Sequence, residues 1–228
     1  MKNKILIILV ICFISCKTDN RESPNEEKKI TKTIDTVFFD EKGDTIKSQT
    51  AYLKNNYKLI IFPALDKKNK GIINFRLING KKDNTYLLAS TFIANYRPYY
   101  EGVDFQNYFA LHSNGGGTSN SYFWLYDKET GNEVLTYSYF KIRLDFDLKN
   151  ELILYEDEDN EYKKFIYDVN TKTKTLVDIP KSFADKQECT RNDYFEKASY
   201  IKRVTDKYYF IAFKDCPSSV EFKIKKTK

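Results

Sequence analysis

The stretch Leu125-Tyr126-Asp127-Lys128-Glu129-Thr130-Gly131 joins two runs that are rich in aromatic and β-branched residues. Such runs, separated by a short polar segment, predict two strands and the turn between them. The Asp side chain can cap the turn, and Gly131 can adopt a left-handed backbone conformation. The pattern returns about 41 residues later as Ile166-Tyr167-Asp168-Val169-Asn170-Thr171-Lys172, without the glycine. The sequence therefore predicts a repeated antiparallel hairpin.

The Tyr-Asp-x-x-Thr-Gly turn resembles the strand-to-strand turn of several β-propeller families. A repeat of 40 to 50 residues is the length of one propeller blade. The resemblance covers about 70 residues and implies four blades of about 45 residues each. A β-sandwich or a meandering sheet fits the same pattern. The predicted fold class is all-β, with antiparallel hairpins forming either a small propeller-like array or a sandwich or meander.

Four longer hairpins are predicted from strand-forming runs and the polar turns between them. They pair Tyr57–Phe62 with Ile72–Ile78, Tyr108–His112 with Tyr122–Asp127, Leu152–Tyr155 with Phe165–Val169, and Tyr208–Phe213 with Val220–Ile224. A shorter hairpin turns at Asp40–Asp44, and further strands are expected at Tyr86–Ile93, Val134–Leu144 and Thr175–Ile179. The one candidate helix, Ser182–Ile201, has poorly periodic apolar positions, and a loop fits it equally well.

The composition is that of one aromatic-rich globular domain. The 228 residues are 41% hydrophobic and 16% aromatic, which excludes a disordered chain. The 38 Lys and Arg against 32 Asp and Glu give a formal charge of +6, mixed along the chain and dominated by Lys. Because Lys is a poor residue for base recognition, we expect no nucleic-acid partner.

The N-terminus has the features of a signal peptide over residues 1–15. Lys2 and Lys4 form a positive start, and the apolar run Ile5–Ile14 is too short to span a bilayer. Ser15-Cys16 resembles the lipobox of bacterial lipoproteins, although Phe13 stands where that family usually has an aliphatic residue. The resemblance implies that Cys16 becomes the acylated first residue; a plain secretory signal is the alternative.

Residues 16–33 are then expected to be the lipidated cysteine and a flexible tether, because this stretch is almost free of large apolar side chains. The single all-β domain is expected over residues 34–228. The expected location is the cell envelope, lipid-anchored to a membrane, with the outer membrane favoured over the inner one.

Two cysteines, Cys189 and Cys216, remain in the domain. In an oxidising compartment an even pair predicts a disulfide, which would close a loop of about 27 residues and contribute about 3 kcal/mol. A metal or redox pair is disfavoured, because the spacing is unsuitable and further ligands are missing.

Two segments supply the candidate contact residues. Tyr96, Arg97, Tyr99 and Tyr100 fall in a loop-like stretch, where we do not expect three tyrosines to be buried together. The Gly-rich stretch His112–Asn120 lacks the Lys-Ser/Thr ending of a phosphate loop and is followed by a strand. It is interpreted as a rim loop, with His112 and Asn114 as candidate binding residues.

The sequence offers no recognisable catalytic set. His112 is the single histidine, and the adjacent Ser113 would point to the opposite face of a strand. The acidic stretch Glu156–Glu161 does not match a calcium loop and is interpreted as a solvated hairpin tip. No metal and no cofactor are expected.

The predicted function is that of a non-catalytic protein-binding lipoprotein, with immunity or assembly factor as examples. The expected partners are the membrane, through the lipid, and a protein; the oligomeric state is left open. A glycan- or small-ligand-binding lipoprotein and an envelope hydrolase are the alternatives.

Overall fold

The computed structural model describes residues 37–92, 97–114, 121–139, 144–157, 163–178, 199–213 and 221–227. These ranges belong to one compact unit, Val37–Lys228. They hold fourteen β-strands, the 3-10 turn η1 (Lys54–Asn56) and no α-helix, so the domain is all-β. The strands are β1 (Gln49–Leu53), β2 (Tyr57–Leu65), β3 (Gly71–Asn79), β4 (Lys82–Ala89), β5 (Tyr108–Ser113), β6 (Ser121–Asp127), β7 (Glu133–Tyr139), β8 (Asp145–Asp147), β9 (Leu152–Asp157), β10 (Lys163–Asp168), β11 (Thr173–Leu176), β12 (Ser199–Val204), β13 (Tyr208–Phe213) and β14 (Glu221–Lys225).

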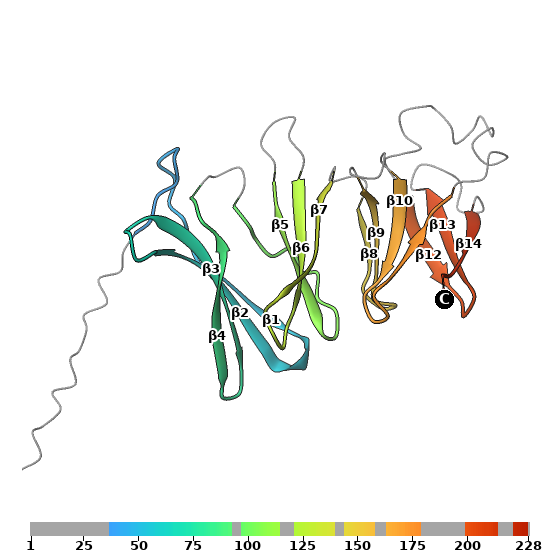
Figure 1. Cartoon of the computed structure of the whole chain (residues 1–228), viewed down its shortest axis with the longest axis horizontal. Helices are drawn as coiled ribbons and strands as arrows, with labels where there is room; N and C mark the ends of the chain where they lie inside the picture. Colours follow the sequence, from blue (N-terminus) through green and yellow to red (C-terminus); the bar gives the residue numbers. More distant parts are fainter. Residues whose placement is uncertain are drawn as a thin grey trace, which may run out of the picture. The chain divides into compact units, whose positions relative to one another are not determined.

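The strands form four antiparallel sheets, each made of consecutive strands (Figure 1). The first sheet is β1-β2-β3-β4 and the second is β5-β6-β7. The third sheet is β11-β10-β9-β8 and the fourth is β12-β13-β14. Four separate sheets of consecutive strands correspond to the propeller-like array that the sequence predicted as one possibility. A sandwich would instead pack two larger sheets face to face.

The four predicted hairpins are confirmed as the pairs β2–β3, β5–β6, β9–β10 and β13–β14. The short hairpin at Asp40–Asp44 is confirmed by a bridge between Phe39 and Thr45. The predicted helix is wrong at its C-terminal end, because Ser199–Ile201 starts β12; residues 182–198 lie outside the described residues.

The Asp-centred turn recurs with the same hydrogen bonds. In the β6–β7 turn, Asp127 accepts the backbone N–H of Thr130 at 2.8 Å, and Gly131 adopts φ +68°. In the β10–β11 turn, Asp168 accepts the N–H of Thr171 at 3.0 Å, and Lys172 takes the left-handed position at φ +58°. The repeat in the sequence is therefore a repeat in the structure.

A third copy of the turn joins β8 and β9. Asp147 accepts the backbone N–H of Asn150 at 3.0 Å, and Glu151 adopts φ +55°. This copy has Asn where the others have Thr, so the residue pattern alone does not show it. A left-handed backbone costs a residue with a Cβ about 1–2 kcal/mol, which the rest of the turn must offset.

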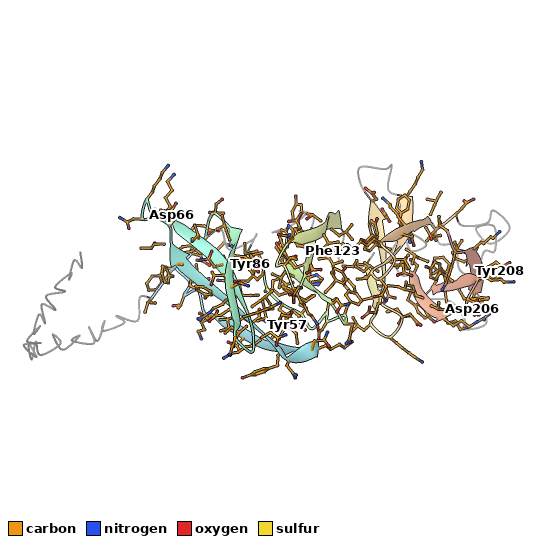
Figure 2. The ribbon with its side chains drawn as sticks, turned by 60° about the horizontal axis from the view of Figure 1, so that its bottom comes forward. Tyr57, Asp66, Tyr86, Phe123, Asp206 and Tyr208 are labelled. Carbon is orange, nitrogen blue, oxygen red and sulfur yellow. The ribbon has the colours of Figure 1, made fainter. Side chains whose placement is uncertain are left out.

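Three buried clusters lie between consecutive sheets. The first includes Phe75 of the first sheet and Phe109 of the second, with ring centroids 5.8 Å apart. The second includes Phe123 of the second sheet, which is labelled in Figure 2, and Tyr155 of the third, with ring centroids 6.3 Å apart. The third joins β9 and β10 with all three strands of the fourth sheet. Burial of apolar side chains at these junctions is the main stabilising term, about 25 cal/mol per Å².

A buried ammonium group fixes the segment that leads into β5. The side chain of Lys128 is 1% exposed; its Nζ lies 2.6 Å from Asp104 and donates to the carbonyl of Phe105 at 2.7 Å. Burial lowers the pKa of Lys128, although the hydrogen bond and charge of Asp104 raise it. Asp104 also accepts the backbone N–H of Lys54 at 2.7 Å. These contacts hold the part of the segment before β5 that contains Asp104. The earlier part of the same segment is held by backbone pairing between Tyr99 and His112 of β5.

Candidate functional site

The segment 97–100 lies between the first and second sheets. Tyr99 and His112 of β5 exchange backbone hydrogen bonds of 2.7 and 2.8 Å. On the other side, the Gln49 amide group of β1 donates to the Tyr100 carbonyl at 2.8 Å and accepts the Tyr100 N–H at 2.8 Å. The segment is therefore a short bridge between the two sheets, fixed by main-chain and amide hydrogen bonds.

The Tyr99 hydroxyl links the two candidate segments of the sequence. It donates to Oδ1 of Asn114 at 2.8 Å. Burial raises the pKa of Tyr99 to about 12, with a further contribution from the negative charge of Glu101. The phenol therefore stays protonated and remains a donor over the whole physiological range.

The predicted contact residues differ in their exposure. Arg97, Tyr99 and Tyr100 are half-buried, and Asn114 is exposed. His112 is only 2% exposed, so it positions Tyr99 and does not present its ring to solvent. Tyr96 lies outside the described residues.

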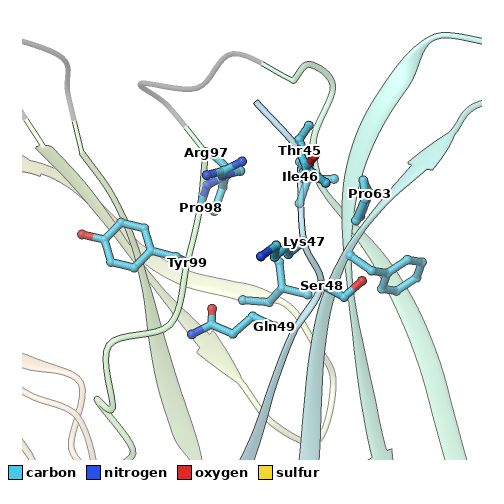
Figure 3. A pocket seen from close by; sticks show the side chains of 12 residues that line it. Thr45, Ile46, Lys47, Ser48, Gln49, Pro63, Arg97, Pro98 and Tyr99 are labelled. Carbon is cyan, nitrogen blue, oxygen red and sulfur yellow. The ribbon is translucent and has the colours of Figure 1, made fainter. Parts of the chain in front are cut away.

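A cavity of about 330 Å³ opens between the segment 97–99 and the segment 45–49 that leads into β1 (Figure 3). We call it the Arg97 pocket. Its apolar lining residues come mainly from β2 and β3, and the lining also includes hydroxyl, amide and cationic groups. The lining residues are Thr45, Ile46, Lys47, Ser48, Gln49, Ile61, Phe62, Pro63, Ile73, Arg97, Pro98 and Tyr99. No carboxylate is among them.

The guanidinium group of Arg97 is incompletely satisfied. Its Nη1 is buried and has no hydrogen-bond partner among the described residues. A buried donor to which nothing is bonded costs about 1–3 kcal/mol, and more when it belongs to a charged group. Lys47, on the opposite side of the pocket, adds a second cation and is exposed. The pocket is thus suited to an anionic group.

A second hollow of about 490 Å³, which we call the Trp124 hollow, shares Pro98 with the Arg97 pocket. The rings of Tyr122 and Trp124 stack there with centroids 6.2 Å apart, and Leu87 is 62% exposed. The hydroxyl of Ser113 is buried without a hydrogen-bond partner in the described part of the chain. The lining residues are Leu87, Leu88, Ala89, Ser90, Thr91, Pro98, Ser113, Tyr122 and Trp124. This hollow is suited to an apolar group.

The interpretation of the acidic stretch as a solvated tip is wrong for its first two residues, which are buried, and residues 158–161 lie outside the described residues. Glu156 and Asp157 are 3% and 2% exposed. Asp157 accepts a hydrogen bond from Lys174 at 2.7 Å, and the Lys174 ammonium lies 3.8 Å from the centre of the Phe165 ring. Glu156 and Asp157 lie in β9 of the third sheet, where they pair with Lys164 and Lys163 of β10. Within the described ranges, no group of three or more His, Cys, Asp or Glu side chains is placed to hold a metal ion.

Several predicted features lie outside the described residues: Cys16 with the signal and tether, the pair Cys189 and Cys216, and the glycines of the rim loop. The disulfide and the lipidation stay predictions. In the parts that the structure describes, no helix has the length and hydropathy needed to cross a membrane.

The chain matches no protein-family model and no curated protein. Among solved structures it is similar to the β-propeller domain of the Trilobed protease from Pyrococcus furiosus, with 12% sequence identity and a TM-score of 0.33. That alignment covers 79% of this chain and 56% of the other.

Sequence reasoning missed the residues that face the candidate segment. Lys47 precedes a strand that is not apparent in the sequence, because β1 contains Tyr52 at 80% exposure and has little apolar alternation. Tyr122 and Trp124 could have been found, since residues two apart on a predicted strand share one face. Both residues lie on β6, the second strand of a hairpin that the sequence predicted.

Proposed function

We propose that this chain is a lipid-anchored protein of the bacterial cell envelope that acts by binding a protein partner. The tether would carry the lipid on Cys16. The contact surface, which we call the bridge surface, consists of the segment 97–100, residues 112–114 and the two hollows. The observation that carries the proposal is the Tyr99–Asn114 hydrogen bond, which joins two separate candidate segments beside these hollows.

The shape and chemistry of the bridge surface support recognition of a protein. Protein interfaces are anchored by a few side chains that insert into desolvated pockets, with aromatic and Arg residues prominent among them. Leu87, Trp124 and Arg97 provide such a set around the shared Pro98. Leu87 exposes apolar surface to water in the free chain. A bound apolar side chain of the partner would cover this surface and so stabilise the complex.

The bridge surface favours a protein over a glycan. Its second hollow is lined by Leu87, Leu88 and Pro98 beside the two aromatic rings. Hydroxyl groups also line this hollow, from Ser90, Thr91, Ser113 and Tyr122. Most of the surface that lines it is nevertheless apolar, so most hydroxyls of a sugar would find no polar partner there. An aliphatic or aromatic side chain of a protein suits it better.

The proposal is tested by capture with a matched pair of variants. The mature domain, carrying Cys16→Ser to keep it soluble, is immobilised and incubated with envelope extract of its own host. Leu87→Asp alters the bridge surface, and Leu176→Asp is the control, because Leu176 is also exposed (46%) but lies on β11 of the third sheet. We expect one protein to be retained by the parent and by Leu176→Asp, and lost by Leu87→Asp. A protein retained equally by both variants, or none retained by the folded parent, would overturn the proposal.

Lipidation is tested separately. In the host, we expect the parent to partition with membranes and to carry an acylated N-terminal Cys16, and we expect Cys16→Ser to abolish both. Mass spectrometry of the N-terminal peptide distinguishes this result from a plain secretory signal.

A further inference from the structure

The structure describes three arginines, and they differ in how their charge is balanced. Arg76 pairs with Asp83, and Arg203 lies 2.6 Å from Glu221. Both are substantially exposed, at 42% and 48%, where water could have solvated them. Arg97 has a buried nitrogen, yet no carboxylate or carbonyl in the described ranges accepts from that nitrogen. Among these three arginines, Arg97 with its buried nitrogen has the greatest need of a counter-ion, yet it is the one without a carboxylate partner in the described part of the chain.

The groups around Arg97 indicate what would balance its charge. A guanidinium group presents a planar fork of N–H donors that matches the two oxygens of a carboxylate. Lys47 and the Ser48 and Thr45 hydroxyls lie across the pocket from Arg97, and they add donors without adding negative charge (Figure 3). Without Lys2 and Lys4 of the signal peptide, the mature chain keeps a formal charge of +4, which also favours an acidic partner.

The second hollow restricts the ligand further. Pro98 lines both cavities, so the two are neighbours, and an extended ligand whose carboxylate reaches Arg97 can place an adjacent group in the Trp124 hollow. The volumes of about 330 and 490 Å³ lie at the lower end of the range of ligand pockets, and each is large enough for one side chain of a protein ligand. An extended protein segment, with an acidic side chain beside an apolar one, satisfies both.

We propose that the Arg97 pocket binds the carboxylate of an acidic side chain in a protein segment, while a neighbouring apolar side chain of that segment occupies the Trp124 hollow. This inference rests on the proposed function and names the chemistry of the partner's contact residues. Arg97 supplies the charge-assisted hydrogen bonds, and Leu87, Tyr122 and Trp124 supply the apolar contact.

The chain provides its own reporter for the test. Trp124 is the single tryptophan of the sequence and lines the second hollow, so its fluorescence responds when the hollow is filled. The full mature chain with Cys16→Ser is titrated with acetyl-Gly-Leu-Glu-Leu-Gly-amide and with the same peptide carrying Gln in place of Glu. Leucine on both sides makes the test independent of which neighbour enters the hollow.

We expect the Glu peptide to bind about tenfold more tightly than the Gln peptide, the effect of one charge-assisted contact. Arg97→Met should abolish this preference, and Arg97→Lys should retain part of it. The control Arg203→Met, on the fourth sheet, should leave it unchanged. Thermal unfolding of each variant verifies that it is folded. Equal affinity of the parent for both peptides, no binding of either, or a preference that survives Arg97→Met would overturn the proposal.

Failure here and failure of the proposed function have different signatures. If the peptides show no Arg97-dependent preference while Leu87→Asp still loses the captured protein, the bridge surface binds a protein but the carboxylate subsite is wrong. If Leu87→Asp retains the captured protein, the proposed surface itself is wrong.

Discussion

The junction of the first and second sheets and the junction of the third and fourth sheets each carry an arginine beside a hollow, but only one of these two arginines pairs with a carboxylate of the described residues. At the later junction, a hollow of about 710 Å³ lies between β8 and β12. Its Lys202 and Arg203 both pair with Glu221, at 2.9 and 2.6 Å. At the earlier junction, no described carboxylate meets Arg97. We infer that a hollow between neighbouring sheets is a candidate binding site when no carboxylate of the chain pairs with its arginine.

The two junctions also differ in how their turns are packed. The β6–β7 turn lies against the first sheet, and a Cβ added at Gly131 would collide with the Tyr86 ring. Tyr86 stacks on Phe75 with centroids 5.0 Å apart, so it has little room to move. The β10–β11 turn places Lys172 at the same turn position, where a side chain is accommodated. Gly131 is thus required by packing as well as by its backbone conformation.

The largest effect is expected for Gly131→Ala. The added methyl group displaces Tyr86 from Phe75, and φ +68° strains any residue with a Cβ. We expect the free energy of unfolding to fall by about 2–4 kcal/mol. Urea denaturation measures it, with Lys172→Ala as the control that should be nearly neutral. A loss below about 1 kcal/mol would show that the first junction does not depend on this contact.

Arg97→Met is expected to raise the free energy of unfolding by about 1 kcal/mol, because an apolar group replaces a buried donor without a partner. Arg203→Met should leave it unchanged or lower it slightly, since that guanidinium is exposed and paired. The same denaturation experiment compares the two. Clear destabilisation by Arg97→Met would mean that Arg97 has an internal role and is not a vacant binding group.

Lys172→Gly should stabilise the domain by about 0.5–1 kcal/mol. Glycine adopts φ +58° without the steric cost that Lys172 bears, although the unfolded chain gains some entropy. Thermal unfolding provides the measurement. Destabilisation instead would indicate that the Lys172 side chain has contacts in the native state that outweigh the strain.

The smallest effect concerns pH and the paired cations of the later junction. Hydrogen bonds from Arg203, and then from Lys202, hold the pKa of Glu221 below its ordinary value of 4.5. A lowered pKa contributes stability above pH 4.5 that is lost as the pH falls through the folded-state pKa. We therefore expect the parent to be slightly more stable than Glu221→Gln near neutral pH, and the two melting temperatures to converge in acid. A difference that does not change with pH would contradict the pairing.

The sequence predicted most of the hairpins, because strand alternation and the Asp-x-x-Thr turn are local signals. It missed β1, which has little apolar alternation, β8, which is only three residues long, and β12, which begins inside the segment considered as a candidate helix. It also placed Tyr99 and Asn114 in separate loops. Their meeting depends on backbone pairing between Tyr99 and His112, which no local pattern encodes. Whether an arginine finds a carboxylate likewise depends on tertiary packing, so the contrast between Arg97 and Arg203 could not be predicted.

The most direct test of the account follows backbone amide NMR shifts while the Leu-Glu-Leu peptide is added to the Cys16→Ser chain. We expect the shifts to concentrate at residues 45–49, 87–91 and 97–99, around the two hollows of the first junction. We also expect them to disappear in Arg97→Met at the same peptide concentration. Shifts that concentrate instead at residues 145–150 and 200–204, or that Arg97→Met leaves intact, would contradict it.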